Sequence, residues 1–365
     1  MDKKIKDRVY LKKTNKGNFD KFVLGLDVGG THTNTCISGV KDNKIELIFS
    51  LHFKTKDLKS IEPAIKKTLK YAQENYSIKV YTAIIAAAGF VEDNKFVKLT
   101  NASWNLNADK IKENTNLDDV FIINDFQAIG YAINVLDHKN ENQIFTVRGK
   151  NKKDKNANLT KSIIGAGTGL GKTTCLYNEK VDAYIPIPSE GGHSDFPIQN
   201  DFEKNLVEYI KKKRKIKEPL TYEELISGRG IEGIYQYLRD TKKYISTKFS
   251  EEIDKSKDKA PLISKYKEKD KTCRETFELF VKFYARCAKN FVLETLSTGG
   301  LYLAGGIVSK NKNFFKKNNF IKEFEKAYRR SNILKRTPVY IIMNYDVSLY
   351  GACFAAVNKK ILGFK

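Results

Sequence analysis

Residues 161–174 read KSIIGAGTGLGKTT, an apolar stretch that runs into four glycines and a lysine. The ending GLGKTT is similar to a P-loop, which requires Gly, four spacers and Gly-Lys-Ser/Thr before a helix. Counting back from Gly171 places Ala166, not glycine, at the first position. The next residues, TTCLYNEKVDAYIPI, alternate apolar and polar side chains around Asn178-Glu179, which predicts two strands joined by a turn. We therefore expect a glycine turn between strands, without the helix N-terminus that a P-loop needs.

A similar glycine turn lies near the N-terminus in GLDVGGTHTNT (25–35), again after an apolar run and before a second strand. Glycine permits backbone conformations with positive φ and exposes N–H groups without a Cβ in the way. Either turn alone is most simply a tight hairpin without a ligand. Two such turns, one in each half of the chain, favour a pair of hairpin tips that hold a polyphosphate. Asp27 ends its strand, where a carboxylate can orient Mg²⁺ through water.

The remaining apolar runs alternate between strand and helix patterns. Buried strands are predicted at 22–28, 33–40, 44–53, 82–89, 119–125, 300–305 and 338–343, and helices at 59–76, 126–136, 275–298 and 313–328. Such alternation predicts an α/β fold whose mostly parallel sheets are covered on both faces.

Two domains follow from the polar, aperiodic segment 138–160, which is typical of a loop or linker. We place a small α/β domain at 1–137 and a large α/β domain at 138–344. A C-terminal helix within 345–365 is expected to pack back on the small domain. The highly charged segment 241–272 is interpreted as a helical excursion at the surface.

Composition narrows the function classes. The chain has 365 residues, 41% apolar residues and a formal net charge of +23. It contains no run of 18 apolar residues and no signal-peptide core, so we expect a soluble cytoplasmic protein without a membrane partner. Lysines are spread along the whole chain, which favours a solvated surface over a specific nucleic-acid site. The five cysteines and four histidines are scattered, so we expect buried free thiols and no protein metal site.

Seven motifs occur in one order along the chain: DVGGT (27–31), TNASW (100–104), INDF (123–126), GAGTGLG (165–171), SEGGHSDF (189–196), ISGRG (226–230) and LYLAGGIV (301–308). In this set the chain resembles the glucokinases of the hexokinase, actin and heat-shock ATPase superfold. The resemblance implies a two-domain, actin-like ATPase (ribonuclease H-like) fold with a ligand cleft between the domains. It also implies ATP-dependent phosphorylation of glucose at the 6-hydroxyl, giving glucose 6-phosphate and ADP, with Mg²⁺, in a homodimer.

The resemblance assigns residues to this chemistry. Asp125 matches the catalytic base, although by its position alone an aspartate before a helix is most simply a cap. His193 alone would be a structural histidine, and Glu223 alone a solvated helix acid. Trp104 lines either the cleft or the core. The implied substrate contacts are Asn101, Asn124, Asp125, Glu190, His193 and Glu223. The implied nucleotide contacts are Asp27, Gly29, Gly30, Thr31, Gly167, Thr168, Gly169, Gly228, Gly305 and Gly306.

The chain departs from the family pattern at two positions. Asn34 stands where a basic residue is usual, and Lys172 is a possible substitute for the lost phosphate contact. Arg229 stands where proline is common, beside the expected adenine pocket. Three alternatives stay open at this point: a polyphosphate donor, another hexose such as mannose or glucosamine, and a sugar sensor without catalysis.

Overall fold

The computed structural model describes residues 6–11, 16–42, 44–99, 102–149, 158–242, 244–317 and 319–357. The chain forms two compact units. Unit 1 comprises Met1–Asp137, Cys175–Pro188 and Asn344–Lys365, and unit 2 comprises His138–Thr174 and Ser189–Met343. The segment Cys175–Pro188, which the sequence analysis placed in the large domain, is thus grouped with unit 1.

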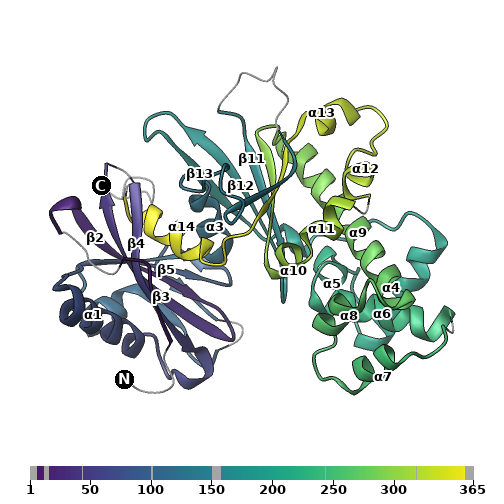
Figure 1. The fold of residues 1–365 in the computed structure, drawn as a ribbon, viewed down its shortest axis with the longest axis horizontal. Helices are drawn as coiled ribbons and strands as arrows, with labels where there is room; N and C mark the ends of the chain where they lie inside the picture. The colour runs from purple at the N-terminus through teal and green to yellow at the C-terminus, as the bar shows by residue number, and fades with distance from the viewer. Residues whose placement is uncertain are drawn as a thin grey trace. The chain divides into compact units, whose positions relative to one another are not determined.

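Unit 1 is built on a six-stranded sheet in the order β1–β4–β3–β2–β5–β9 (Figure 1). The first four strands of this order pair antiparallel, whereas β2, β5 and β9 are parallel. Three short strands, β6, β7 and β8, form a separate small sheet. The strands are β1 (Lys6–Val9), β2 (Lys21–Val28), β3 (His32–Lys41), β4 (Lys44–Lys54), β5 (Thr82–Ala87), β6 (Val91–Glu92), β7 (Phe96–Val97), β8 (Leu106–Asn107) and β9 (Asp119–Asn124). The α-helices are α1 (Glu62–Tyr76), α2 (Ala108–Asn114), α3 (Asp125–Ala132) and α14 (Val347–Val357).

The two faces of the sheet in unit 1 bury different cores, because successive strand residues point to opposite sides. Leu24 and Leu26 of β2 share one core with Ile65 of α1. Val23, the residue before Leu24, points to the other side and belongs to a second core with residues of α3 and α14. Helices α3 and α14 approach closely: a Cβ on Gly351 would lie 1.6 Å from the carbonyl oxygen of Ala128. The helix at the C-terminal end therefore packs on unit 1 through backbone contact.

Unit 2 contains strands of a second six-stranded sheet, in the order β10–β15–β14–β11–β12–β13. The strands are β10 (Ile144–Arg148), β11 (Lys161–Ala166), β12 (Leu170–Asn178), β13 (Ala183–Ser189), β14 (Gly300–Ala304) and β15 (Val339–Ile342). The α-helices are α4 (Asp201–Arg214), α5 (Tyr222–Leu225), α6 (Gly228–Lys242), α7 (Lys248–Lys255), α8 (Ala260–Tyr266), α9 (Lys271–Thr295), α10 (Gly306–Lys310), α11 (Lys312–Lys317), α12 (Phe320–Phe324) and α13 (Ser331–Arg336).

Helix α9 is the centre of the core of unit 2. Its buried aromatic residues include Phe277, Phe280 and Tyr284, which pack with residues of α6, α11 and α12. The hydroxyl of Tyr284 donates to the carbonyl oxygen of Ile164, 2.9 Å away on β11. This hydrogen bond satisfies a buried hydroxyl and ties the helix to the strand that leads into the glycine turn.

Three sequence predictions were wrong. The sheets expected to be mostly parallel are mixed, because β1–β4–β3–β2 and β10–β15 pair antiparallel, whereas β2–β5–β9 and β11–β14–β15 pair parallel. The expected linker 138–160 contains β10, which pairs antiparallel with β15 at the edge of the sheet. The expected helix 313–328 is interrupted, because Asn319 adopts a left-handed conformation with φ 47° between α11 and α12. The predicted helical excursion is confirmed by α7 and α8. The five cysteines are buried free thiols, as expected.

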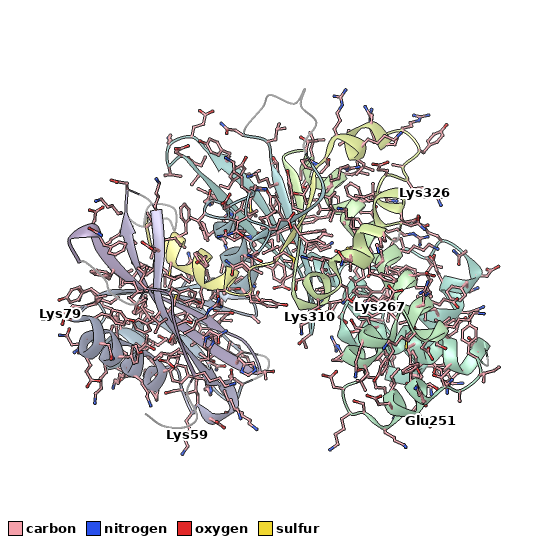
Figure 2. The ribbon with its side chains drawn as sticks, in the orientation of Figure 1. Lys59, Lys79, Glu251, Lys267, Lys310 and Lys326 are labelled. Atoms are coloured by element: carbon pink, nitrogen blue, oxygen red, sulfur yellow. The ribbon has the colours of Figure 1, made fainter. Side chains whose placement is uncertain are left out.

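Exposed lysines occur on both units. In Figure 2 the side chains of Lys59 and Lys79 extend from unit 1, and those of Lys310 and Lys326 extend from unit 2; all four residues are exposed. Among the helices in the described part of the chain, none combines the length and the apolar character needed to cross a membrane.

Candidate functional site

Asn124 and Asp125 stand where strand β9 passes directly into helix α3. The Asn124 side-chain oxygen accepts from the backbone N–H groups of Phe126 and Gln127, at 2.8 and 3.3 Å, and so caps the helix. Its side-chain amide also donates to the carbonyl oxygen of Gly89, 3.2 Å away. The cap is thus Asn124, and Asp125 is the first residue of the helix. The Oδ1 atom of Asp125 also accepts from the backbone N–H of Phe126, at 2.9 Å. The Asp125 carboxylate lies at the carboxyl edge of the parallel strands.

Asp27 lies at the same edge of the sheet in unit 1. It pairs with Ala86 of β5, while Asn124 pairs with the next β5 residue, Ala87. Burial, and secondly the charge of Asp125, raise the pKa of Asp27 to about 7, although a hydrogen bond from Asn34 opposes the shift. Two carboxylates therefore share one edge closely enough for each charge to be felt by the other.

Asn34 stands where the family pattern has a basic residue. It links Asp27 to a series of hydrogen-bonded side chains on strands β3 and β4. Its side-chain oxygen is hydrogen-bonded to Nδ1 of His52 at 2.8 Å. The other ring nitrogen, Nε2, is 3.2 Å from the hydroxyl of Ser50. Burial lowers the pKa of His52, which favours the neutral imidazole. The position thus carries a neutral hydrogen-bonded side chain in place of a cation.

The first glycine turn, Gly29–Thr31, joins β2 to β3. Its Gly29 N–H donates to the carbonyl oxygen of His32 at 2.9 Å. Thr55, which follows β4, stabilises the turn through two hydrogen bonds. Its hydroxyl donates to the Gly29 carbonyl at 2.7 Å and its N–H to the Thr31 carbonyl at 3.0 Å. Gly30 and Thr31 are exposed. Thr55 was missed by the sequence analysis, since an isolated threonine after a strand carries no distinguishing signal.

The second glycine turn, Gly167–Gly169, joins β11 to β12 in unit 2. Gly167 N–H donates to the Gly169 carbonyl at 2.8 Å, which closes the turn. A strand follows the turn, as the sequence predicted, so the P-loop interpretation fails. Gly167 and Thr168 are exposed, and a Cβ on Gly167 would meet nothing within 4 Å. The tip of this turn is therefore open to a ligand.

Two further glycine segments lie against the second glycine turn. Gly228 N–H, at the start of α6, donates to the Gly167 carbonyl at 2.9 Å. Gly305, with φ 93°, follows β14, and a Cβ there would lie 2.5 Å from the carbonyl oxygen of Ala166. Gly306 opens α10, and a Cβ there would meet nothing within 4 Å. All the expected nucleotide contacts of unit 2 thus gather around the end of β11.

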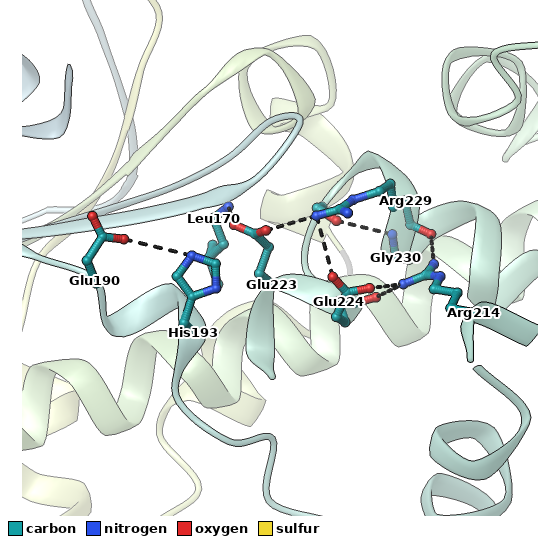
Figure 3. Close-up of polar contacts among 9 residues, drawn as sticks. Leu170, Glu190, His193, Arg214, Glu223, Glu224, Arg229 and Gly230 are labelled. Carbon is teal, nitrogen blue, oxygen red and sulfur yellow. Dashed lines mark hydrogen bonds and ion pairs between the residues drawn. The ribbon is translucent and has the colours of Figure 1, made fainter. Parts of the chain in front are cut away.

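Leu170, the residue after the turn, brings the expected sugar contacts of unit 2 to the same place (Figure 3). Its N–H donates to Glu223 Oε2 at 2.9 Å. Its carbonyl oxygen would be 1.9 Å from a Cβ on Gly192, so the loop that carries Glu190 and His193 lies directly against it. Glu190 Oε2 and His193 Nε2 are 3.8 Å apart, and both side chains are exposed. Sequence analysis did not identify Leu170, because its contribution is made by the backbone.

Lys172 does not have the orientation expected of a phosphate contact. Its side chain is buried at 4% relative exposure. Its Nζ lies 5.1 Å from the ring centre of Tyr222 and 5.2 Å from that of Phe291. The ammonium is therefore directed into aromatic surroundings inside unit 2, an orientation that does not favour the phosphate contact expected of Lys172.

The remaining expected contacts stand as follows. Asn101 lies outside the described residues. Trp104 is buried, and its indole N–H donates to the carbonyl oxygen of Leu58 at 3.0 Å, so it belongs to the core of unit 1. The expected site residues of unit 1 lie together within unit 1, and those of unit 2 lie together within unit 2.

The donor set of unit 1 is suited to a magnesium ion that arrives with phosphate. Among the described residues, no group of three or more His, Cys, Asp and Glu side chains could hold a metal by itself. Mg²⁺ keeps several waters and takes only one or two carboxylates beside substrate phosphates. Asp27 fits this requirement, because a nearby cation would relieve the repulsion between its carboxylate and Asp125.

Comparison with known proteins gives consistent matches along most of the chain. A protein-family model described as Glucokinase matches residues 24–359. The glucokinase of Trichormus variabilis is 32% identical over 351 residues, which cover 92% of this chain and 99% of the relative.

Solved structures share the fold. A glucokinase from Balamuthia mandrillaris in complex with glucose has a TM-score of 0.75 at 21% identity, over 93% of this chain and 94% of that one. A ROK family glucokinase from Streptomyces griseus in complex with glucose and AMPPNP has a TM-score of 0.58 at 18% identity, over 93% of this chain and 99% of that one.

Proposed function

This chain belongs to the glucokinase family and has its actin-like ATPase fold. We propose below the role of each site residue in catalysis and in binding. The chain is an enzyme that phosphorylates glucose with ATP. The product is glucose 6-phosphate, and ADP is released. The alternatives of a polyphosphate donor and a sensor without catalysis gain no support from the family or its relatives.

Asp125 is the general base of this proposal. It accepts the proton of the 6-hydroxyl as that oxygen attacks the γ-phosphorus and the bond to the leaving ADP oxygen breaks. One observation carries the assignment: Asp125 follows a buried strand at the edge where its charge raises the pKa of Asp27. Asn124, which caps α3 through its oxygen, retains amide hydrogen-bonding capacity for a neighbouring sugar hydroxyl.

The two glycine turns bind the triphosphate through exposed backbone N–H groups, and Gly228, Gly305 and Gly306 accommodate the adenosine. Mg²⁺, oriented through water by Asp27, would supply positive charge that neutralises the phosphate oxygens during transfer. Glu190 and Glu223 accept hydrogen bonds from the sugar hydroxyls, and the imidazole of His193 either accepts from a hydroxyl or donates to one. Asn101 completes the proposed sugar contacts.

A coupled kinase assay with Asp125→Asn tests the base. The variant should retain glucose binding by calorimetry, while kcat falls by about 10²- to 10⁴-fold, the usual contribution of a positioned base. Asp109→Asn, which removes an exposed carboxylate of α2 that pairs with Lys95, is the matched control and should keep normal turnover. Near-normal turnover of Asp125→Asn would contradict the assignment. A panel of glucose, mannose and glucosamine in the same assay determines the preferred sugar.

We further propose that the enzyme works in the cytoplasm as a homodimer, as the family resemblance implies. Light scattering at the concentration used for assay measures the oligomeric state directly. A mass near 41.7 kDa, that of a single chain, would contradict the dimer.

A further inference from the structure

The carboxylate of Glu223 is held from two sides in unit 2 (Figure 3). Its Oε2 accepts from the backbone N–H of Leu170 at 2.9 Å, and its Oε1 accepts from Arg229 Nη2, also at 2.9 Å. A carboxylate oxygen can accept two hydrogen bonds. Each oxygen therefore keeps capacity for a hydroxyl group after both internal contacts are made.

The guanidinium of Arg229 is itself fixed by its neighbours at the start of α6. Its Nη2 lies 3.4 Å from Oε1 of Glu224 as well as beside Glu223. Arg214 Nη2 donates to the backbone carbonyl of Arg229 at 2.6 Å, and Arg214 is also paired with the Glu224 carboxylate. The Arg229 side chain is 54% exposed, so solvent screening leaves its ion pair little effect on overall stability. The ion pair can still orient the Glu223 carboxylate, even though it contributes little to the free energy of unfolding.

The second glycine turn has no room beside this carboxylate. A Cβ on Gly169 would lie 2.6 Å from Glu223 Oε2 and 3.3 Å from its Cδ. At Gly167, two residues earlier, a Cβ would meet nothing within 4 Å. Glu223 therefore occupies the space above Gly169, and the turn and the carboxylate constrain each other.

We propose that Arg229 is a positioning residue for the sugar: together with the N–H of Leu170, it fixes the Glu223 carboxylate against the second glycine turn in the orientation that receives glucose. The inference rests on the proposed sugar-binding role of Glu223. A carboxylate held before binding loses less conformational freedom when hydroxyl groups attach to it. Without the guanidinium, Glu223 keeps one internal contact and can rotate about it, which weakens glucose binding while the phosphate contacts stay in place.

Arg229→Ala tests this role by calorimetric titration of the intact protein with glucose, without nucleotide. The Kd for glucose should rise by about 3- to 10-fold, in the range expected for losing one charged hydrogen bond at a partly exposed site. In steady-state assays the KM for glucose should rise by a similar factor, with the KM for ATP and kcat nearly unchanged. Arg229→Lys should restore part of the affinity, because its ammonium reaches the same carboxylate without the planar fork.

Arg274→Ala is the matched control, since Arg274 is about as exposed as Arg229 and forms an ion pair with Glu268 at 2.8 Å in the same unit. Its Kd for glucose should equal that of the wild type. Gly169→Ala tests the position of Glu223 independently of Arg229, because the added Cβ would displace the Glu223 carboxylate. Gly169→Ala should weaken glucose binding in the absence of nucleotide, whereas Gly167→Ala should not.

The outcomes separate the two proposals. An unchanged or lower Kd for glucose in Arg229→Ala, with normal binding by the wild type, overturns the positioning role and leaves the kinase assignment intact. An equal rise in the KM for ATP also overturns it, because that pattern reports a general disturbance of unit 2. A wild-type protein that binds no glucose overturns the proposed function and the role of Glu223 together.

Discussion

Replacing Asp27 with asparagine should increase the free energy of unfolding of unit 1 over that of the wild type, and this gain should be larger at alkaline pH than at acidic pH. Asp27 is a partly buried carboxyl beside Asp125, and its pKa is raised from an ordinary value of 3.8 to about 7. Asparagine has nearly the same shape and carries no charge at any pH. The substitution therefore removes the ionisation while preserving the local packing.

The magnitude follows from proton linkage. Because the folded-state pKa lies above the unfolded one, the stabilising contribution of the protonated group is complete below pH 3.8 and is lost as pH rises through about 7. One unit of pKa corresponds to roughly 1.4 kcal/mol. Between pH 5 and pH 8 the wild type should lose about 3 kcal/mol from this carboxyl, and the variant should lose none of it.

Urea unfolding at the two pH values measures the effect, with EDTA present so that no divalent cation binds the carboxylates. The single tryptophan of the chain, Trp104, is buried in unit 1, so its fluorescence reports the unit that contains Asp27. Asp109→Asn controls for the loss of one negative charge from the same unit. The difference in free energy of unfolding between Asp27→Asn and wild type should be larger at pH 8. An equal difference at both pH values would refute the electrostatic account of this carboxylate pair.

Two other substitutions test the packing described above. Lys172→Met replaces the buried ammonium near Tyr222 and Phe291 with an apolar side chain of similar length. The KM for ATP should stay within about twofold of wild type, because the loss of a phosphate contact would have a larger effect. A rise of tenfold or more in the KM for ATP would show that Lys172 does contact phosphate. Gly351→Ala places a Cβ 1.6 Å from the Ala128 carbonyl oxygen, and α3 and α14 can relieve this clash only by separating. The free energy of unfolding of unit 1 should fall by more than about 3 kcal/mol in the same tryptophan assay. An unchanged urea midpoint would show that the helices have room to adjust.

The secondary structure was predictable wherever its signal is local. The strand expected at 22–28 is observed as Lys21–Val28, and that expected at 119–125 as Asp119–Asn124. A continuous apolar run between polar residues is sufficient to identify a strand that is buried on both faces. The edge strand β10 has only one fully buried residue, Ile144, in five. Its signal was therefore lost in the surrounding charged sequence.

The interrupted helix shows a limit of a different kind. The apolar residues of 313–328 have a spacing compatible with one long helix, and Phe315, Phe320 and Phe324 are indeed buried. The break at Asn319 depends on the backbone conformation that packing against α9 and its neighbours requires. Periodicity describes which side chains face the core, but it does not reveal where the chain bends to place them there.

By itself, the sequence determined the kinds of functional group available and their places at the ends of strands: a carboxylate after a buried strand, and glycines where the backbone must be exposed. Only the tertiary structure decided which groups act on one another. Glu223 meets the N–H of Leu170 across 53 residues of sequence, and Lys172 turns away into aromatic surroundings. Hydrogen bonds, steric exclusion and pKa shifts depend on distances of a few ångströms, and folding sets those distances between residues that are far apart in the chain.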